Sequence, residues 1–285
     1  MYPLILLQQL IASSTHLFAK HVTSLIHPST VVFFRGCFSA LAFGLWMILT
    51  RKSLKAIDKE DIPGVFVLGA LNMPINQLLF IWGVRYTTPA NASLAYALTP
   101  AFVLIIAVLF LGEQLNIRKM AGITIAMLGT IIVLFEKGLS FQNDQFLGNI
   151  MVLGASISWA VYTTIGKQYA MKYGGIYTTG LSMTAGLLLY IPIVLVLPYE
   201  LSPVSYDASM WFQLFYLGVI TSGLGYGLWY IALTRMDASK LAVFNNIQPV
   251  LTTIMAFFLF HSLPGEVFFL GAFIAIIGVI ITQLG

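Results

Sequence analysis

Long apolar runs, separated by short polar stretches, recur from one end of the chain to the other. Most runs reach the ~17 residues at which a helix crosses about 30 Å of hydrocarbon. The pattern predicts ten membrane-spanning helices, expected at 3–20, 29–50, 62–84, 90–111, 119–135, 147–168, 175–198, 211–233, 240–260 and 265–284. Because the connections are short, we expect the function to lie within this all-α helix bundle.

Composition supports the membrane interpretation. Hydrophobic residues make up 59% of the chain and charged residues 8%, whereas a soluble domain carries roughly 25% charged residues. The lone Cys37 cannot form an intrachain disulfide or pair with a second thiol around a metal. We therefore expect no metal and no cofactor. A lipid bilayer and a small-molecule substrate are the expected partners.

Positive residues predict the orientation, because Lys and Arg in short loops favour the cytoplasmic side. With a cytoplasmic N-terminus, ten of the fourteen Lys and Arg residues fall in cytoplasmic loops, three fall in outer loops, and Arg35 lies within a span. Both termini are therefore expected in the cytoplasm, with the chain in a bacterial-type inner membrane. The first apolar run has no basic residue before Lys20, so it is expected to be a retained span. The loop bias accounts for the net charge of +4 without any nucleic-acid partner.

The chain also repeats itself at an offset of 149 residues. Each half then holds five predicted helices, at 1–143 and 144–285, and an odd number places the second half in the membrane upside down. Such inverted repeats are typical of secondary transporters, whose substrate site lies between the halves. The pairs in register that matter most are Pro100 with Pro249, Gly69 with Gly218, Gly122 with Gly271, and Gly129 with Gly278.

Several of these segments carry a family resemblance. The sequence FLGEQL at 110–115, the proline-containing fourth and ninth helices, and the glycine-spaced AGITIAMLGTIIV and LGAFIAIIGVIIT resemble the EamA-like branch of the drug/metabolite transporter superfamily. The resemblance implies a ten-helix basket with a central cavity that moves small metabolites such as amino acids. The second copy departs from the pattern, because Ser262 stands at the position equivalent to Glu113.

The sequence FNNIQPV at 244–250 is the most polar cluster inside an apolar run. Unpaired polar groups in hydrocarbon cost several kcal/mol each, so Asn245, Asn246 and Gln248 must face protein or water. Pro249 removes a backbone donor and is expected to free the carbonyl of Asn245. Such amides either bond neighbouring helices or line a cavity, and three of them beside a proline favour a cavity.

Other polar and aromatic residues are placed to complete that cavity. In the third predicted helix Asn72 and Asn76 are four apart and are expected on one face. The additional substrate-binding candidates are Asn72, Asn76, Gln77, Tyr96, Thr99, Ser13, His16, Trp159, Tyr162, Tyr226, Trp229 and Tyr230.

Acidic residues are missing from the predicted spans, which argues against a carboxylate-driven antiporter. The same absence, with no HExxH or GxSxG motif, leaves an enzyme without its acid and base, so the chain is not expected to be an enzyme. His16 is the one intramembrane group of a residue type whose unperturbed pKa lies near neutral, which makes a proton a candidate coupling ion. Arg35 and Lys20 either neutralise a substrate anion, bond carbonyls or snorkel, and snorkelling is favoured for Lys20.

These features favour a secondary transporter or facilitator. The expected substrate is a small polar metabolite, in particular an amino acid or related zwitterion, moved by alternating access. The alternative is a quaternary ammonium such as choline, held by cation-π contacts in an aromatic-lined site.

The predicted topology can be tested by single cysteines introduced after removal of the native one. Cysteines at Lys55, Lys172 and Arg235 should react with an impermeant thiol reagent only from the cytoplasm, and cysteines at Asp144 and Asp207 only from outside. Labelling of positions 55 and 207 from the same side would rule out the inverted repeat.

Overall fold

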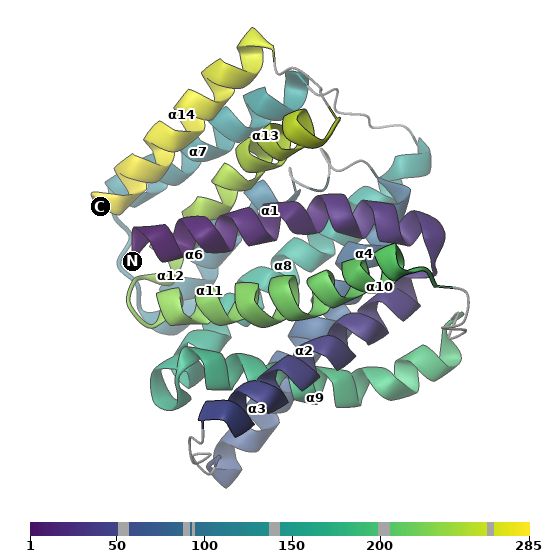
Figure 1. Ribbon diagram of the computed structural model, residues 1–285. Coiled ribbons are helices and arrows are strands. Elements are labelled where there is room, and N and C mark those ends of the chain that lie inside the picture. Colours follow the sequence, from purple (N-terminus) through teal and green to yellow (C-terminus); the bar gives the residue numbers. More distant parts are fainter. Residues whose placement is uncertain (51–56, 88–91, 93–94, 137–142, 199–205, 261–264) are drawn as a thin grey trace.

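The computed structural model describes residues 1–285 apart from 51–56, 88–91, 93–94, 137–142, 199–205 and 261–264. This described part of the chain is helical and contains no strand. Figure 1 shows the helices gathered into one bundle with the two termini near each other. The elements are α1 (Tyr2–Leu25), α2 (Pro28–Thr50), η1 (Lys59–Asp61), α3 (Ile62–Ala70), η2 (Leu71–Gln77), α4 (Leu78–Tyr86), α6 (Thr99–Leu111), α7 (Ile117–Glu136), α8 (Asn143–Tyr173), α9 (Gly175–Val196), α10 (Ala208–Phe215), η4 (Tyr216–Gly225), α11 (Tyr226–Leu233), α12 (Ala238–Ala242), η5 (Val243–Ile247), α13 (Gln248–Phe260) and α14 (Glu266–Gln283).

The surface of the bundle is apolar, as a bilayer requires. Leu49, Phe110 and Val196 have exposed fractions of 79%, 74% and 86%, which water would penalise and lipid does not. Six of the described helical stretches are long and apolar enough to cross a membrane. The membrane class predicted from composition is confirmed.

Three predicted spans contain irregular turns that hydropathy does not reveal. The range 62–84 is divided into α3, the π-helical η2 and α4, and 211–233 contains the π-helical η4. The range 240–260 contains the 3₁₀ segment η5. Pro74 lies inside η2, where its missing N–H explains a departure from α-helical bonding.

In the range expected as a helix at 90–111, the described residues Ala92 and 95–97 are helical and Leu98 forms a turn. α6 starts at Thr99 with Pro100 in its first turn, the position where a proline costs no intrahelical bond. Residues 90–91 and 93–94 of the expected range lie outside the described residues. α8 runs from Asn143 to Tyr173, which is longer at both ends than the predicted range 147–168.

Glycines allow α7 and α14 to pack at backbone contact. A Cβ on Gly122 would lie 2.8 Å from the carbonyl oxygen of Gly278, and a Cβ on Gly129 would lie 2.7 Å from that of Gly271. Small residues at such positions let membrane helices approach closely. The two helices run as a pair at one edge of the bundle (Figure 1).

Charged residues bind the loops together at both ends of the spans. Lys172 lies 2.6 Å from Asp58 and 2.5 Å from Asp61, which joins two segments expected on the cytoplasmic side. Near the other end of the spans, Lys20 Nζ donates to the carbonyls of Val84 at 2.9 Å and Thr87 at 2.9 Å. Lys20 therefore satisfies the last carbonyls of α4 instead of snorkelling to the membrane surface.

Glu113 is the centre of a second group of charges. Its side chain is 6% exposed, and Lys119 and Lys167 each lie 3.9 Å away. It accepts hydrogen bonds from the amide of Ala238 at 2.7 Å and from the hydroxyl of Ser239. The carboxylate thus ties the turn after α6 to the start of α12.

Asp237 belongs to the same group of charges and accepts a hydrogen bond from Lys119 at 2.8 Å. Partial burial raises its pKa, but the hydrogen bond and charge of Lys119, with the charges of Lys167 and Lys240, outweigh that effect. The pKa of Asp237 is held below the ordinary carboxylate value, so this contact persists in mildly acidic solution.

We expect Glu113→Ala to destabilise the protein by about 1.5–3 kcal/mol, because it removes a charged acceptor from two buried donors. Thermal unfolding of the purified protein in detergent measures the loss. Glu60→Ala is the control, since Glu60 is an exposed acid near the same membrane side and should leave the unfolding temperature unchanged. Equal stability of the two variants would contradict the structural role of Glu113.

Candidate substrate site

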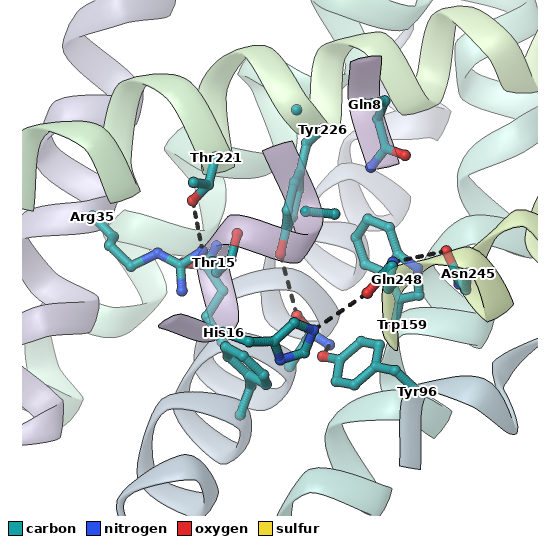
Figure 2. A pocket seen from close by; sticks show the side chains of 15 residues that line it. Gln8, Thr15, His16, Arg35, Tyr96, Trp159, Thr221, Tyr226, Asn245 and Gln248 are labelled. Atoms are coloured by element: carbon teal, nitrogen blue, oxygen red, sulfur yellow. Dashed lines mark hydrogen bonds between the residues drawn. The ribbon is translucent and has the colours of Figure 1, made fainter. Parts of the chain in front are cut away.

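A polar cavity lies at the centre of the bundle, among α1, α2, η2, α8, η4 and the junction of η5 with α13. Figure 2 shows side chains from these elements converging on it. It offers about 60 Å³ to the centres of water molecules, several times the roughly 10–15 Å³ that one water needs. The described lining residues are Gln8, Ala12, Thr15, His16, Arg35, Asn76, Gln77, Phe80, Tyr96, Trp159, Thr221, Gly225, Tyr226, Asn245 and Gln248.

A chain of amides crosses one side of the cavity from α13 to α1 (Figure 2). Asn245 Oδ1 accepts from Gln248 Nε2 at 3.2 Å and from Gln9 Nε2 at 3.3 Å. Gln248 Oε1 lies 3.3 Å from His16 Nε2. Asn245 and Gln248 both come from the FNNIQPV cluster, which therefore reaches across the bundle to the first helix.

The backbone at this cluster differs from the prediction. The backbone carbonyl of Asn245 was expected to be free because Pro249 lacks an N–H, but the backbone N–H of Gln248 donates to it. The prediction was wrong because the chain tightens into the 3₁₀ segment η5, which uses the donor three residues ahead. What the proline provides is an irregular turn, and that turn aims Asn245 into the cavity.

The π-helical segment η2 supplies a second group of amides. Asn76 Nδ2 donates to the hydroxyl of Tyr96 at 3.0 Å and to the carbonyl of Ala155 at 2.7 Å. Its Oδ1 accepts from the hydroxyl of Tyr226 at 3.3 Å. Asn76 is thereby fixed between the fourth, sixth and eighth predicted helices.

Aromatic rings close the remaining walls. Trp159 and Tyr226 have ring centroids 4.8 Å apart at 60°. The ring centroid of Tyr96 lies 6.0 Å from that of His16 and 5.6 Å from that of Phe80, and both ring pairs are T-shaped. These rings restrict both the position of His16 and the width of the cavity.

Four polar residues predicted at the site lie outside this lining. Asn72 was expected to share a helix face with Asn76, but in the π-helix it accepts from Gln77 Nε2, five residues ahead, at 3.1 Å. The hydroxyl of Ser13 donates to the carbonyl of Gln9, that of Thr99 lies 2.8 Å from Ser156 Oγ, and Asn246 Oδ1 accepts from Thr130 at 3.0 Å. All four bond to protein instead of facing the cavity.

Three predicted aromatic residues also lie behind the lining. Tyr162 Oη is 2.8 Å from Ser182 Oγ, Trp229 Nε1 donates to Thr163 at 3.1 Å, and Tyr230 donates to the carbonyl of Tyr162 at 3.0 Å. They pack against Trp159 and Tyr226 as a supporting layer. Eight predicted residues do line the cavity: His16, Asn76, Gln77, Tyr96, Trp159, Tyr226, Asn245 and Gln248.

Sequence reasoning missed seven lining residues, namely Gln8, Ala12, Thr15, Arg35, Phe80, Thr221 and Gly225. Helical spacing holds a signal for three of them, because Gln8, Ala12 and Thr15 share a face of α1 with His16. Arg35 was not among the predicted site residues, although neutralisation of a substrate anion was one of the roles considered for it.

Buried polar atoms without partners concentrate at this cavity. Eight such side-chain atoms occur in the described residues, and five belong to residues that line it. They are Gln8 Oε1, His16 Nδ1, Arg35 Nη1, Gln77 Oε1 and Asn245 Nδ2. Because a buried unpaired group is costly, the cavity is built to hydrogen-bond a polar occupant. No group of three His, Cys, Asp or Glu side chains in the described residues could hold a metal ion.

Similar proteins carry transporter names. An uncharacterized transporter from Archaeoglobus fulgidus is 27% identical over 98% of this chain and 96% of its own length. A probable terminal-alkyne amino-acid exporter from Streptantibioticus cattleyicolor is 26% identical over 78% of this chain and 73% of its own length. An uncharacterized transporter from Bacillus subtilis is 25% identical over 98% of this chain and 92% of its own.

The fold also matches a protein of known crystal structure, with a TM-score of 0.81 and 18% identity over 100% of this chain and 97% of that one. At that identity the likeness concerns the fold alone. The model of the EamA-like transporter family matches residues 1–135 and 146–284, nearly the whole chain. The chain, with its apolar helices around a central polar cavity, belongs to the EamA-like transporter family.

Proposed function

We propose that the protein is a secondary transporter or facilitator that moves a small polar metabolite, an amino acid or related zwitterion, across the inner membrane by alternating access. The observation that carries this proposal is the central cavity, where five buried polar atoms lack partners. A scaffold protein would gain nothing from such unpaired groups, whereas a transporter offers them to its substrate. The relative named as a probable amino-acid exporter supports the substrate class.

Alternating access rests on the proposed organisation as ten helices in two inverted repeats, at 1–143 and 144–285. The family model matches one segment in each half. Glycine packing supports the duplication as well, because Gly122 faces Gly278 and Gly129 faces Gly271. Gly122 corresponds to Gly271 at the 149-residue offset, and Gly129 corresponds to Gly278. Each contact is therefore the repeat equivalent of the other, as expected for two halves related by a two-fold axis. The cavity receives residues from both halves, which is where a rocking-bundle transporter binds its substrate.

The proposed orientation places both termini in the cytoplasm. Segments predicted on the same side of the membrane contact each other, as Asp61 does with Lys172 and Glu113 with Lys167. This agreement supports the grouping of these segments on one side of the membrane, and their positive charge is the reason for assigning that side to the cytoplasm.

A quaternary ammonium such as choline is the weaker candidate. Trp159 and Tyr226 provide aromatic faces suited to a cation. The buried guanidinium of Arg35 lines the same cavity, however, and like charges in a low-dielectric site repel strongly. The charge of the cavity therefore favours a zwitterion.

Asn245→Ala and Asn246→Ala form a matched pair of adjacent variants that tests the site. We expect Asn245→Ala to weaken substrate binding by ~1 to 3 kcal/mol, a loss of roughly 5- to 150-fold, and to lower stability as well, because it strands the side-chain amides of Gln9 and Gln248. Asn246→Ala should instead leave affinity unchanged and lower stability by ~0.5 to 1.5 kcal/mol, because it removes one hydrogen bond of Thr130 and leaves that hydroxyl the backbone carbonyl of residue 246 as acceptor.

Tracer uptake into proteoliposomes, screened with the neutral amino acids, supplies the affinity, and thermal unfolding of the same samples supplies the stability. A destabilised Asn245→Ala protein with unaltered affinity would remove this residue from the site. Absence of uptake for every amino acid tested would refute the proposed function.

Proton coupling, where present, is expected at His16, because none of the described lining residues is acidic. In wild-type proteoliposomes an imposed pH gradient should accelerate uptake, and His16→Gln should remove that dependence while it keeps a hydrogen-bonding side chain beside Gln248. Uptake rates at matched and opposed pH measure the effect. Proton-driven uptake that survives in His16→Gln would exclude the histidine as the carrier.

A further inference from the structure

Arg35 is the one charged residue in the described lining of the cavity. It lies seven residues into α2, about 10 Å along the helix from its start, and its side chain is 1% exposed. The hydroxyl of Ser222 accepts from Nε at 3.1 Å and from Nη2 at 2.9 Å, and Thr221 Oγ1 lies 3.5 Å from Nη2. These contacts fix one edge of the guanidinium and leave Nη1 without a partner.

No carboxylate balances this charge within the described residues. The ion pairs described there involve Lys119, Lys167 and Lys172, all in other parts of the fold. The hydroxyl of Tyr226 lies close enough to interact with the Arg35 guanidinium, but its geometry leaves Nη1 without a hydrogen bond. A phenol also brings no negative charge, and this one donates to Asn76 Oδ1 at 3.3 Å. Arginine does not lose its proton in proteins, so the cavity carries a net positive charge.

A purely structural arginine would be satisfied by the protein around it. Lys20 shows that arrangement, because its ammonium donates to three backbone carbonyls at one helix end. Arg35 is held by two hydroxyls instead, while its remaining nitrogen belongs to the lining of a cavity. A buried cation without a counter-charge is costly, and that cost is relieved when an anion enters.

We propose that Arg35 binds the carboxylate of the substrate through Nη1, and that the unpaired oxygens of Gln8 and Gln77 accept from its amino group. The inference rests on the proposed function and narrows it, because it makes a carboxylate the required group. Nη1 carries two N–H donors, and either can donate a charge-assisted hydrogen bond to a carboxylate oxygen. Gln8 and Gln77 line the same cavity and have side-chain oxygens without partners, and such oxygens attract an ammonium without adding a negative charge.

This assignment predicts a specific order of ligands. A zwitterionic amino acid satisfies Arg35 and the amide oxygens together. The matching carboxylic acid without an amino group satisfies Arg35 alone, and the matching amide or amine leaves the guanidinium unpaired while it adds a second cation. Affinity should therefore fall in that order for one side chain held constant.

The test uses the full-length protein in detergent and matched probes. For leucine, phenylalanine and threonine, the amino acid, its carboxamide and the acid without the amino group are titrated by thermal shift, which reports dissociation constants through ligand stabilisation. Wild-type protein should bind at least one amino acid about tenfold or more tightly than its carboxamide. The proposal would be overturned if every amino acid and its carboxamide bound equally well, or if no probe with a carboxylate stabilised the protein.

Variants then assign the preference to Arg35. Arg35→Gln should bind the amino acid roughly 10- to 150-fold more weakly and bind the carboxamide unchanged, so the preference disappears. Arg35→Lys should keep the preference with reduced affinity, because it retains the charge without the fixed fork. Ser222→Ala, which leaves the charge but removes its support, should reduce the preference less than Arg35→Gln.

Two controls separate this effect from damage to the fold. Lys20→Met removes the other cation at membrane depth, and Thr23→Val removes a buried hydroxyl that bonds only its own helix; both should keep the wild-type preference. An Arg35→Gln protein that still prefers the amino acid over its carboxamide would overturn the assignment to Arg35. If that variant does not fold, the ratio of the two affinities in the wild-type protein still decides whether a carboxylate is required. Proteoliposome flux of carboxamides equal to that of amino acids would refute the role of Arg35 while transport stands, whereas absence of all flux would refute transport.

Discussion

Hydrocarbon does not solvate polar groups, and this constraint governs the whole chain. Each unpaired donor or acceptor inside a bilayer costs several kcal/mol. Hydroxyls on the helices therefore turn back to carbonyls of their own turn, as Ser13 does to Gln9 and Thr282 does to Gly278. Against that background, the unpaired atoms around the central cavity stand out as groups whose partner comes from outside the protein.

The same constraint explains where the helices become irregular. Non-helical backbone at membrane depth is tolerated only where protein or a polar cavity covers it. The segments η2, η4 and η5 each contribute residues to the cavity lining. Their altered pitch changes which side chains share a face, so that Gln77 pairs with Asn72 and leaves Asn76 to hold Tyr96.

Hydropathy was enough to predict the membrane class and the approximate helix ranges, because the cost of burying charge in lipid applies to every residue in a span. The site could be predicted only in part. Asn245 and Asn246 are adjacent and chemically identical, yet one lines the cavity and the other bonds Thr130. That difference depends on the 3₁₀ turn and on a neighbour more than a hundred residues away, and neither is encoded in the local pattern.

Lys20 and Arg35 show that the surroundings of a buried charge, more than its residue type, determine its role. Backbone carbonyls satisfy Lys20 completely and leave it no capacity to bind a ligand. Arg35 links α2 in the first half to η4 in the second through hydroxyls, and it keeps one nitrogen for a ligand. In the proposed mechanism a bound carboxylate would contact a group anchored to both halves, so its affinity would change with a movement of the halves relative to each other. Such a difference in affinity between states is what a substrate needs in order to drive a conformational change.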